Sequence, residues 1–309
     1  MKTAALIVAA GMDKQADAIS PMRNLGSISV AQRIIATYHQ SGIRMIAIVT
    51  GYQAEELEHH LSNNEVVFLR NPDYADTSMF DSVKIGLEYL KDKCDRVFLT
   101  PVNIPLFTSE TVRRLSACQQ PLACPLCEGK SGHPVLIAAS LFDQILSDSG
   151  RDGIRGALAR CGVEMTMIPV EDSGIFNDFR ATGEYRMLLE QHNAKLVRPV
   201  VHVSLAREKP FFDAKVALLL NLVDETGSVR AACQRMKISY SGGWNMIRML
   251  ETQLHHHLIE RSQGGAGGGK SNLTEEGRWF IRSFRRFEEE LRLQANELFE
   301  SCFEGFFEE

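Results

Sequence analysis

The feature that most constrains the fold is an uninterrupted apolar run, Ala4–Ala10, that ends at Gly11. Apolarity that is continuous rather than alternating predicts a strand covered on both faces. Further apolar strands are predicted at 45–50, 65–69 and 96–100, and helical patterns at 29–38, 54–61 and 78–91 separate them. This βαβα alternation predicts an α/β domain with a Rossmann-like, mostly parallel sheet and helices on both of its faces.

Length and composition support two domains. The chain has 309 residues, of which 44% are hydrophobic and 24% charged, and an ordinary domain holds about 150 residues. The stretch His192–Val203 contains a proline and has no clean helical period, so we expect domains at 1–195 and 196–309. The longest apolar run is far shorter than the about 20 residues of a membrane span. We expect a cytoplasmic protein without membrane association, whose seven cysteines are reduced.

Ligands of parallel sheets bind beyond the carboxyl ends of the strands, and the segments at these ends form an ordered set of motifs. They are Ala9-Ala10-Gly11, Ser20-Pro21, Leu25-Gly26, Asn71-Pro72-Asp73-Tyr74 with Ser82, Pro101-Val102-Asn103-Ile104-Pro105-Leu106, Gly132-His133-Pro134, and Asp178-Phe179-Arg180 through Tyr185. Over about residues 1–190 this layout resembles the MobA-like nucleotidyltransferases, which attach guanylyl or cytidylyl groups to the molybdenum cofactor. The resemblance implies a nucleotide- or ligand-binding crevice formed by Ala10, Gly11, Lys14, Arg23, Asn71, Ser82, Asn103 and His133, with Asp178 as a metal ligand.

Several charged residues of the family pattern are absent. Gln15 and Ser20 stand near the positions of the loop arginine and lysine that neutralise the triphosphate, and Asn103 and Arg180 replace two carboxylates. Mg²⁺ prefers carboxylate oxygens, and transfer of a nucleotidyl group depends on metal and cations. We therefore expect a degenerate nucleotidyltransferase domain. No cofactor is certain, and we expect Mg²⁺ to bind only if the domain is an active enzyme. The alternative is a shifted constellation of Lys14, Arg23, Asp81 and Asp178.

A cluster of thiols lies in the same domain. Cys118, Cys124 and Cys127 precede His133, and the spacing 124–127 forms a C-x-x-C. Four such ligands can hold zinc, and a C-x-x-C can form a redox pair. Because there is no second C-x-x-C, structural thiols are the preferred interpretation.

Charge distinguishes the second domain from the first. Residues 226–287 hold 10 Lys/Arg against 4 Asp/Glu, and residues 288–309 hold 1 Arg against 8 Glu. A basic segment favours a module that binds a polyanion. A solvated surface next to an acidic helix end explains the charges equally well.

The basic segment has the pattern of a winged helix-turn-helix. Helices are predicted at 211–223, 229–236 and 240–255, with an apolar stripe at Trp244, Ile247, Leu250 and Leu254. Small residues at the start of the last helix, including Gly242 and Gly243, suit close approach to the major groove. A β-ribbon with a glycine-rich tip, 258–274, forms the predicted wing. The residues expected to contact DNA are Ser239, Tyr240, Ser241, Asn245, Arg248, Arg261 and Lys270.

This segment resembles the DNA-binding domain of ModE-type molybdate-responsive regulators, which are related to LysR-type winged helices. The matching residues are Asp224-Glu225-Thr226-Gly227-Ser228, Ile238-Ser239-Tyr240, Trp244, Glu260-Arg261, the 264–269 glycine run and Leu273 through Gly277. The resemblance covers about residues 205–300 and implies a dimer on double-stranded DNA. Nothing in the chain resembles the family's separate molybdate-binding domain.

A long helix from Glu275 to about Leu298 supports the expected homodimer. Its apolar residues exceed what one small domain should cover, and they are Trp279, Phe280, Phe284, Phe287, Leu291 and Leu298. The leading hypothesis is a DNA-binding transcriptional regulator whose first domain is a scaffold or binds a nucleotide or a pterin-like small molecule. The alternatives are an active molybdenum-cofactor cytidylyl- or guanylyltransferase that also binds DNA, and a dimeric module that has lost both activities.

Overall fold

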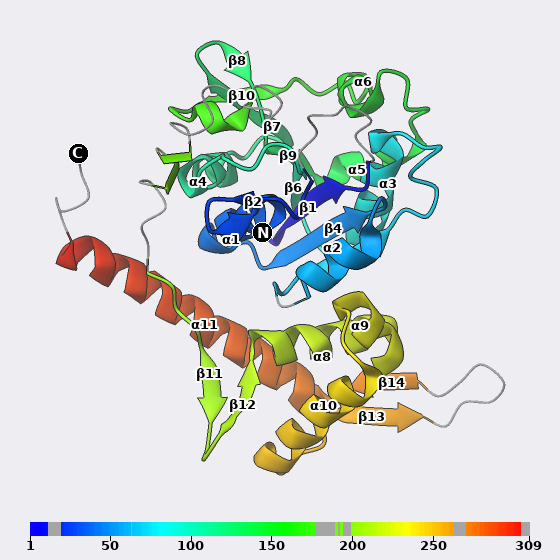
Figure 1. Ribbon diagram of the computed structural model, residues 1–309, viewed down its shortest axis with the longest axis vertical. Helices are drawn as coiled ribbons and strands as arrows, with labels where there is room; N and C mark the ends of the chain where they lie inside the picture. The colour runs from blue at the N-terminus through cyan, green and yellow to red at the C-terminus, as the bar shows by residue number, and fades with distance from the viewer. Residues whose placement is uncertain are drawn as a thin grey trace. The chain divides into compact units, whose positions relative to one another are not determined.

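The chain folds into two compact units, Met1–Leu196 and Val197–Glu309, which are described separately (Figure 1). The computed structural model describes residues 1–11, 20–62, 64–176, 189–190, 192–193, 199–262 and 270–303, without the side chains of residues 261, 262 and 300. Among these residues, no helix has both the length and the apolar character needed to cross a membrane.

The first unit is built on an eight-stranded sheet. Its strands are β1 (Thr3–Ala9), β4 (Met45–Thr50), β5 (Val67–Arg70), β6 (Arg96–Pro101), β7 (Leu122–Cys127), β8 (Lys130–Ser131), β9 (Val135–Ala138) and β10 (Thr166–Pro169). The order is β10–β7–β9–β6–β1–β4–β5, with β8 paired to β7. β1 runs parallel to β4 and β6, whereas β9 runs antiparallel to β6 and β7. The predicted strand at 65–69 begins two residues later, at Val67.

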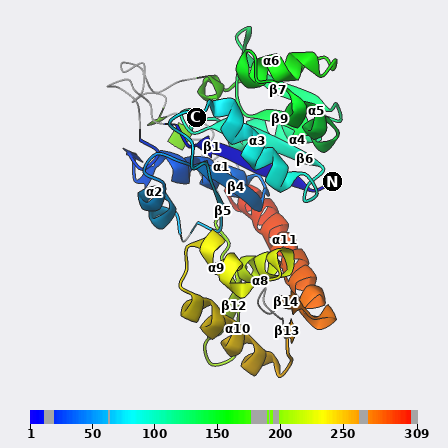
Figure 2. The same cartoon turned by 90° about the vertical axis from the view of Figure 1, so that its right-hand side faces the viewer.

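Helices cover both faces of this sheet, as the continuous apolar strands predict. The helices are α1 (Val30–Gln40), α2 (Ala54–His60), α3 (Met79–Leu90), α4 (Ser109–Ala117), α5 (Phe142–Ser147) and α6 (Gly153–Arg160), with short turns η1 (Ala139–Leu141) and η2 (Ser173–Ile175) and a small hairpin of β2 (Asn24–Leu25) and β3 (Ile28–Ser29). Leu6 and Val8 of β1 pack under α3, α5 and α6, while Ala5 and Ile7 pack under α1, α2 and α4. Figures 1 and 2 show these two layers.

The same alternation separates the two cysteines of the C-x-x-C. Cys124 joins the core on one face of the sheet and Cys127 joins the core on the other. Two thiols on opposite faces of a strand can neither form a disulfide with each other nor share a metal. Burial raises the pKa of the Cys124 thiol, whose Sγ atom donates to Met167 Sδ at an S–S distance of 3.2 Å. The structure therefore excludes the zinc and redox readings of this pair.

The second unit is mainly helical. Its elements are β11 (Ser204–Ala206), β12 (Pro210–Asp213), α8 (Ala214–Thr226), α9 (Val229–Met236), α10 (Tyr240–Leu254), β13 (Ile259–Ser262), β14 (Lys270–Leu273) and α11 (Glu275–Cys302). The helix predicted at 211–223 begins later than expected, because residues 210–213 pair with β11 as an antiparallel hairpin. Asp213 caps α8 by accepting from Val216 N at 3.0 Å, which explains why the helix starts there.

Candidate nucleic-acid interface and ligand crevice

The helix-turn-helix consists of α9, a three-residue turn and α10. Ser228 caps α9 by accepting from Ala231 N at 3.3 Å, and Ser239 caps α10 by accepting from Gly242 N at 3.0 Å. Lys237 in the turn takes the left-handed conformation, with φ 54°. Residues next to each helix, the two serine caps and Lys237, therefore set where α9 begins and ends and where α10 begins. The predicted spans 229–236 and 240–255 match the structure closely.

The inner face of α10 fixes its position on the domain. Trp244, Ile247 and Leu250 are buried as predicted, and Leu254 is half-buried. A Cβ atom on Gly243 would overlap the Sγ atom of Cys233 in α9. The expectation that Gly243 serves close approach to DNA is therefore wrong, because this glycine lets the two helices pack against each other.

The outer face of α10 carries the predicted contact residues. Ser239, Ser241, Asn245 and Arg248 are exposed, and the Tyr240 side chain is 46% exposed. Arg230 was not among the predicted contact residues, yet its guanidinium lies 4.8 Å from the centroid of the Tyr240 ring. Its place in the sequence, two residues after the predicted cap Ser228, could have indicated a phosphate contact, because the first helix of this motif crosses the DNA backbone.

The wing is a two-stranded ribbon beside α10 (Figures 1 and 2). β13 pairs antiparallel with β14, which sets Arg261 opposite Ser271 and Ser262 opposite Lys270. Lys270 is exposed. The glycine-rich tip and the Arg261 side chain lie outside the described residues.

Side chains from three helices hold the base of this ribbon. Glu251 of α10 accepts from the amides of Leu258 and Ile259 at 2.8 and 3.2 Å. Asp224 at the end of α8 accepts from Leu273 N at 3.3 Å and from Arg278 of α11 at 2.8 Å. The acidic residue of the Asp224–Ser228 motif therefore has a structural role, because it fixes the ribbon relative to the helices.

In the first unit, the carboxyl ends of β1, β4 and β5 meet at one edge of the sheet. Tyr52 N donates to Ala10 O at 3.0 Å, and the rings of Tyr52 and Tyr74 lie 6.3 Å apart. A Cβ atom on Gly51 would overlap Ala10 O and the Tyr74 side chain. This edge is closely packed, with Gly11 and the half-exposed Tyr52 ring at its surface.

Asn71 and Ser82 are brought together, but they satisfy each other. Asn71 Nδ2 donates to Ser82 Oγ and to Thr77 Oγ1, both at 3.0 Å, while its Oδ1 accepts from Asp73 N at 3.1 Å. Both residues are 2% exposed. Asn71 and Ser82 therefore stabilise the loop before α3. Of the other predicted ligand contacts, Asn103 is half-buried and Arg23 is exposed.

His133 lies in the turn that precedes β9, on a cis peptide bond to Pro134. Its amide donates to Ile175 O at 2.8 Å. Burial lowers the pKa of the imidazole, so the ring is neutral at neutral pH. Its Nδ1 atom is buried without a hydrogen-bond partner in the described part of the chain.

Among the described residues, those predicted to line the ligand site do not form a magnesium site. Asn103 and a neutral His133 offer no carboxylate, and within the described ranges no group of three or more His, Cys, Asp or Glu residues could hold a metal. The predicted residues Lys14 and Asp178, together with Arg180, lie outside the described residues. The described residues of the predicted ligand site therefore do not offer the carboxylate oxygens that Mg²⁺ prefers.

Comparison with known proteins assigns a class to each unit. The model of the MobA-like NTP transferase domain matches residues 5–165, and that of the bacterial regulatory helix-turn-helix protein of the lysR family matches residues 218–278. A nucleotidyl transferase from Methanothermobacter thermautotroptrophicus superposes with a TM-score of 0.51 at 20% identity, covering 62% of this chain and 98% of that one. This likeness shows the fold alone. Because the first model spans more than half of the chain, the chain belongs to the MobA-like NTP transferase domain family.

The second unit is similar to a different group of proteins. The transcriptional regulator ModE of Yersinia pestis and the DNA-binding transcriptional dual regulator ModE of Escherichia coli K12 are each 32% identical over 78 residues, in the helix-turn-helix region. Each match covers 25% of this chain and 30% of the relative. The chain thus spans under a third of the length of these relatives, and combines a ModE-like helix-turn-helix with a nucleotidyltransferase-like domain.

Proposed function

We propose that this protein is a transcriptional regulator that binds double-stranded DNA through its second unit. The observation that supports this most is the exposed polar face of α10, set between Arg230 and a ribbon with Lys270 at its edge. Such a helix enters the major groove, and a basic ribbon follows the phosphates. The matched ModE proteins are named as regulators, and one of them as DNA-binding.

The first unit acts as a ligand-binding or scaffold module rather than as an efficient nucleotidyltransferase. A bound triphosphate needs cations and a metal, because partly buried unpaired charge is costly. Asn103 and the neutral His133 are uncharged, so they suit a ligand with hydrogen-bonding edges, such as a nucleoside or a pterin-like molecule. An effector bound there would change DNA affinity by a coupling free energy of about 1–3 kcal/mol if the units communicate.

The test combines two measurements on the full chain. A gel shift with DNA from the protein's own promoter region, in competition with unrelated DNA and at two salt concentrations, measures specific binding. Turnover of CTP and GTP with Mg²⁺ measures transfer. Specific binding with background turnover supports the proposal. Efficient turnover together with DNA binding would instead favour the alternative, a working transferase of molybdenum-cofactor maturation that also binds DNA.

A further inference from the structure

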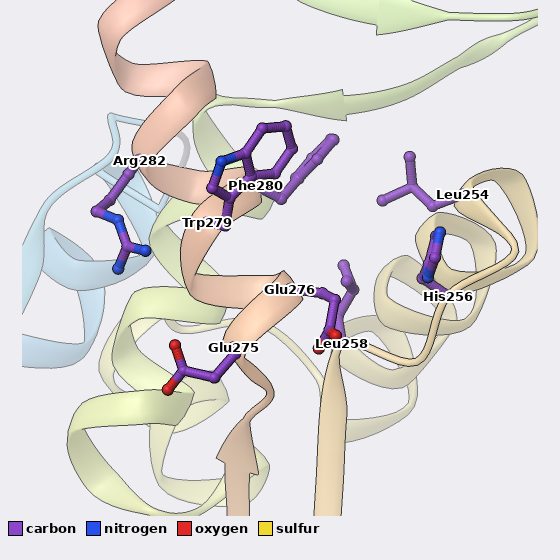
Figure 3. Close-up of a pocket in the computed structure, with 8 residues that line it drawn as sticks. All are labelled: Leu254, His256, Leu258, Glu275, Glu276, Trp279, Phe280 and Arg282. Atoms are coloured by element: carbon purple, nitrogen blue, oxygen red, sulfur yellow. The ribbon is translucent and has the colours of Figure 1, made fainter.

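A groove of about 590 Å³ lies on the second unit, between the first turns of α11 and the segment that joins α10 to β13 (Figure 3). The Trp279 side chain at this groove is 63% exposed. Phe280 and Phe284 are used inside the unit instead, where each contacts Phe212 edge-on at 4.8 Å. Other apolar side chains of α11 are also exposed, namely Phe287, Leu293 and Leu298. The groove is therefore one part of the apolar surface that we expect to form the homodimer.

In the first unit, a buried arginine and a buried histidine join segments that are far apart in the sequence. Arg33 of α1 donates from Nη2 to Leu25 O in the β2–β3 hairpin. Its Nη1 atom donates to Asn193 Oδ1 at 2.9 Å and to His192 Nδ1 at 3.3 Å. A guanidinium has donors only, so the Nδ1 atom of His192 is the acceptor. The Nε2 atom of His192 therefore carries the proton, which it donates to Phe107 O at 3.1 Å.

Apolar contacts connect the same segments. One buried side chain each from the hairpin, from α1 and from the loop after β6 forms a small cluster, which consists of Leu25, Val30 and Leu106. The Leu189 side chain packs against this cluster. Gly26 has φ 76°, and a Cβ atom there would come within 3.1 Å of Arg33 Nη2, so the glycine lets the guanidinium reach the hairpin. We call Leu189, His192 and Asn193, which lie near the end of the first unit, the exit segment.

The segments that meet at Arg33 and His192 carry predicted ligand contacts. Arg23 directly precedes β2 of the hairpin, and Asn103 lies four residues before Phe107 in the loop after β6. The first unit ends three residues after Asn193, where the chain continues into the DNA-binding unit. The contacts therefore connect two loops of the predicted ligand site with the exit segment.

We propose that Arg33 is a positioning residue that couples the predicted ligand site to the exit segment. Arg33 is 2% exposed and His192 is 3% exposed, so water cannot replace their hydrogen bonds, and a buried charge that loses its partners is costly. A ligand that shifts the loop of Arg23 or the loop of Asn103 therefore weakens the hold on the exit segment. The proposal rests on the proposed function and deepens it, because it names the residues through which an effector acts on the DNA-binding unit.

The first experiment is hydrogen exchange of the full chain without DNA, measured in peptides that cover residues 20–26, 102–108 and 189–193. Arg33→Ala should raise exchange in all three peptides together, by about tenfold or more, because hydrogen bonds of a charged group are lost at the point where the segments meet. Faster exchange in one peptide alone would show three independent segments and overturn the proposal. Thermal melting of every variant checks folding.

Arg96→Ala is the matched control. Arg96 is also a buried arginine of the first unit, and it also donates to backbone carbonyls, at 2.6 Å to Cys118 O and at 2.9 Å to Ser116 O. Its loss should leave exchange in the three peptides unchanged. An equal effect of Arg96→Ala on these peptides would mean that Arg33→Ala acts by general destabilisation, which also overturns the proposal.

His192→Phe tests the coupling from the opposite end and keeps an aromatic ring of similar size. It should raise exchange in peptide 20–26 through Arg33, which a purely local role of His192 would not do. Because the two residues act as one unit, the double variant with Arg33→Ala should exchange no faster than Arg33→Ala alone. Two effects that multiply, or an unchanged peptide 20–26 in His192→Phe, contradict the coupling. Asn193→Ala removes one bond of Arg33 and replaces Arg33→Ala if that variant does not fold.

The second experiment adds DNA from the protein's own promoter region. Coupling is reciprocal, so DNA binding should change exchange in peptides 20–26 and 102–108 of the wild type by at least about twofold, and Arg33→Ala should abolish this change. DNA that binds while the first unit stays unchanged overturns the proposal. A chain that shifts no DNA refutes the proposed function instead, and exchange without DNA then still decides whether Arg33 couples the two loops to the exit segment.

Discussion

The guanidinium of Arg230, the second residue of α9, stacks over the ring of Tyr240, the first residue of α10, at 4.8 Å from the ring centroid. Tyr240 in turn contacts Trp244 edge-on at 6.3 Å, and Trp244 is buried. The stack therefore connects an exposed cation to the core through two aromatic rings. A stacked guanidinium keeps its in-plane donors available for a phosphate.

Arg230→Ala should weaken binding on all DNA sequences and flatten the slope of log K against log salt by about 0.9, the value for one phosphate contact. Arg230→Lys should recover only part of the affinity, because an ammonium cannot stack as a planar fork. Tyr240→Leu should lower affinity in the same way although it removes no charge, while Tyr240→Phe keeps the ring and serves as control. Fluorescence anisotropy at several salt concentrations measures these effects. Equal affinity of wild type and Arg230→Ala would contradict the phosphate contact.

Arg248 and Lys270 should behave differently from each other. Arg248 is exposed on the recognition face of α10, so Arg248→Ala should cost about 1–3 kcal/mol on the specific site if it contacts a base. Lys270 is exposed on the wing ribbon, and Lys270→Ala should reduce affinity on specific and unrelated DNA alike. Competition gel shifts with both DNAs separate the two effects. If neither substitution changes binding, the docking of α10 and the wing is wrong.

Gly243→Ala should destabilise the second unit by about 1–3 kcal/mol through overpacking, because the new methyl group would overlap Cys233 Sγ. Gly242→Ala is the comparison, since its new methyl group would meet only Ser239 Oγ at 2.9 Å. Any disturbance of that helix cap is offset by the preference of alanine for a helix. Urea unfolding of both variants provides the comparison. A larger loss in Gly242→Ala than in Gly243→Ala would contradict the packing role of Gly243.

Nucleotidyl transfer from Mg·CTP or Mg·GTP should be close to background, because Asn103 supplies no carboxylate and His133 is neutral. Asn103→Asp together with Arg180→Asp should raise the affinity for Mg²⁺, measured by calorimetry, and the single Asn103→Asp variant should have a smaller effect. Wild-type turnover of about 1 per second or more, an ordinary enzymatic rate, would establish an active enzyme instead.

Asp148, at the end of α5, forms an ion pair with Arg160 of α6. This pair predicts that the stability of the first unit depends on pH. Arg160 donates to both carboxylate oxygens at 2.7 and 2.8 Å, and lowers the pKa of Asp148 to about 2. This pKa is below the unfolded value of about 3.9. The stabilisation is therefore complete above the unfolded pKa and is lost as the pH falls through about 2.

Asp148→Asn should lower the melting temperature at pH 7, and its difference from wild type should shrink as the pH falls from about 4 to about 2. Asp143→Asn, at the exposed Lys91 pair, is the control and should have little effect. Calorimetric melts across this pH range measure both. A difference that grows on acidification would have the wrong sign for this pair.

Local patterns were sufficient to predict much of both units. The run 4–10, ended by Gly11, predicted a strand buried on two faces because each face needs apolar residues. Caps at Ser228 and Ser239, with the stripe at Trp244, Ile247 and Leu250, predicted α9 and α10 because capping and helical periodicity act within a few residues. The exposed residues Asn245 and Arg248 followed from the same periodicity.

Contacts between distant segments could not be read from these patterns. The strand 210–213 looked helical because Phe211 and Phe212 fit a helical spacing, and only pairing with β11 and packing on Phe280 and Phe284 decided otherwise. Asn71 looked like a ligand contact, but the fold places Thr77 and Ser82 within its reach.

The amino-acid sequence by itself determined most of the helices and strands, among them β1, α9 and α10, which face of each is apolar, and where the chain carries its basic charge. These properties depend on residues within a few positions of one another. The tertiary structure alone decided that Cys124 and Cys127 lie in separate cores, that Gly243 faces Cys233, that Arg230 stacks on Tyr240, and that Trp279 is left exposed beside a groove. Each of these depends on how elements pack in space, because side-chain partners far apart in the chain are set by the geometry of packing and by no local preference.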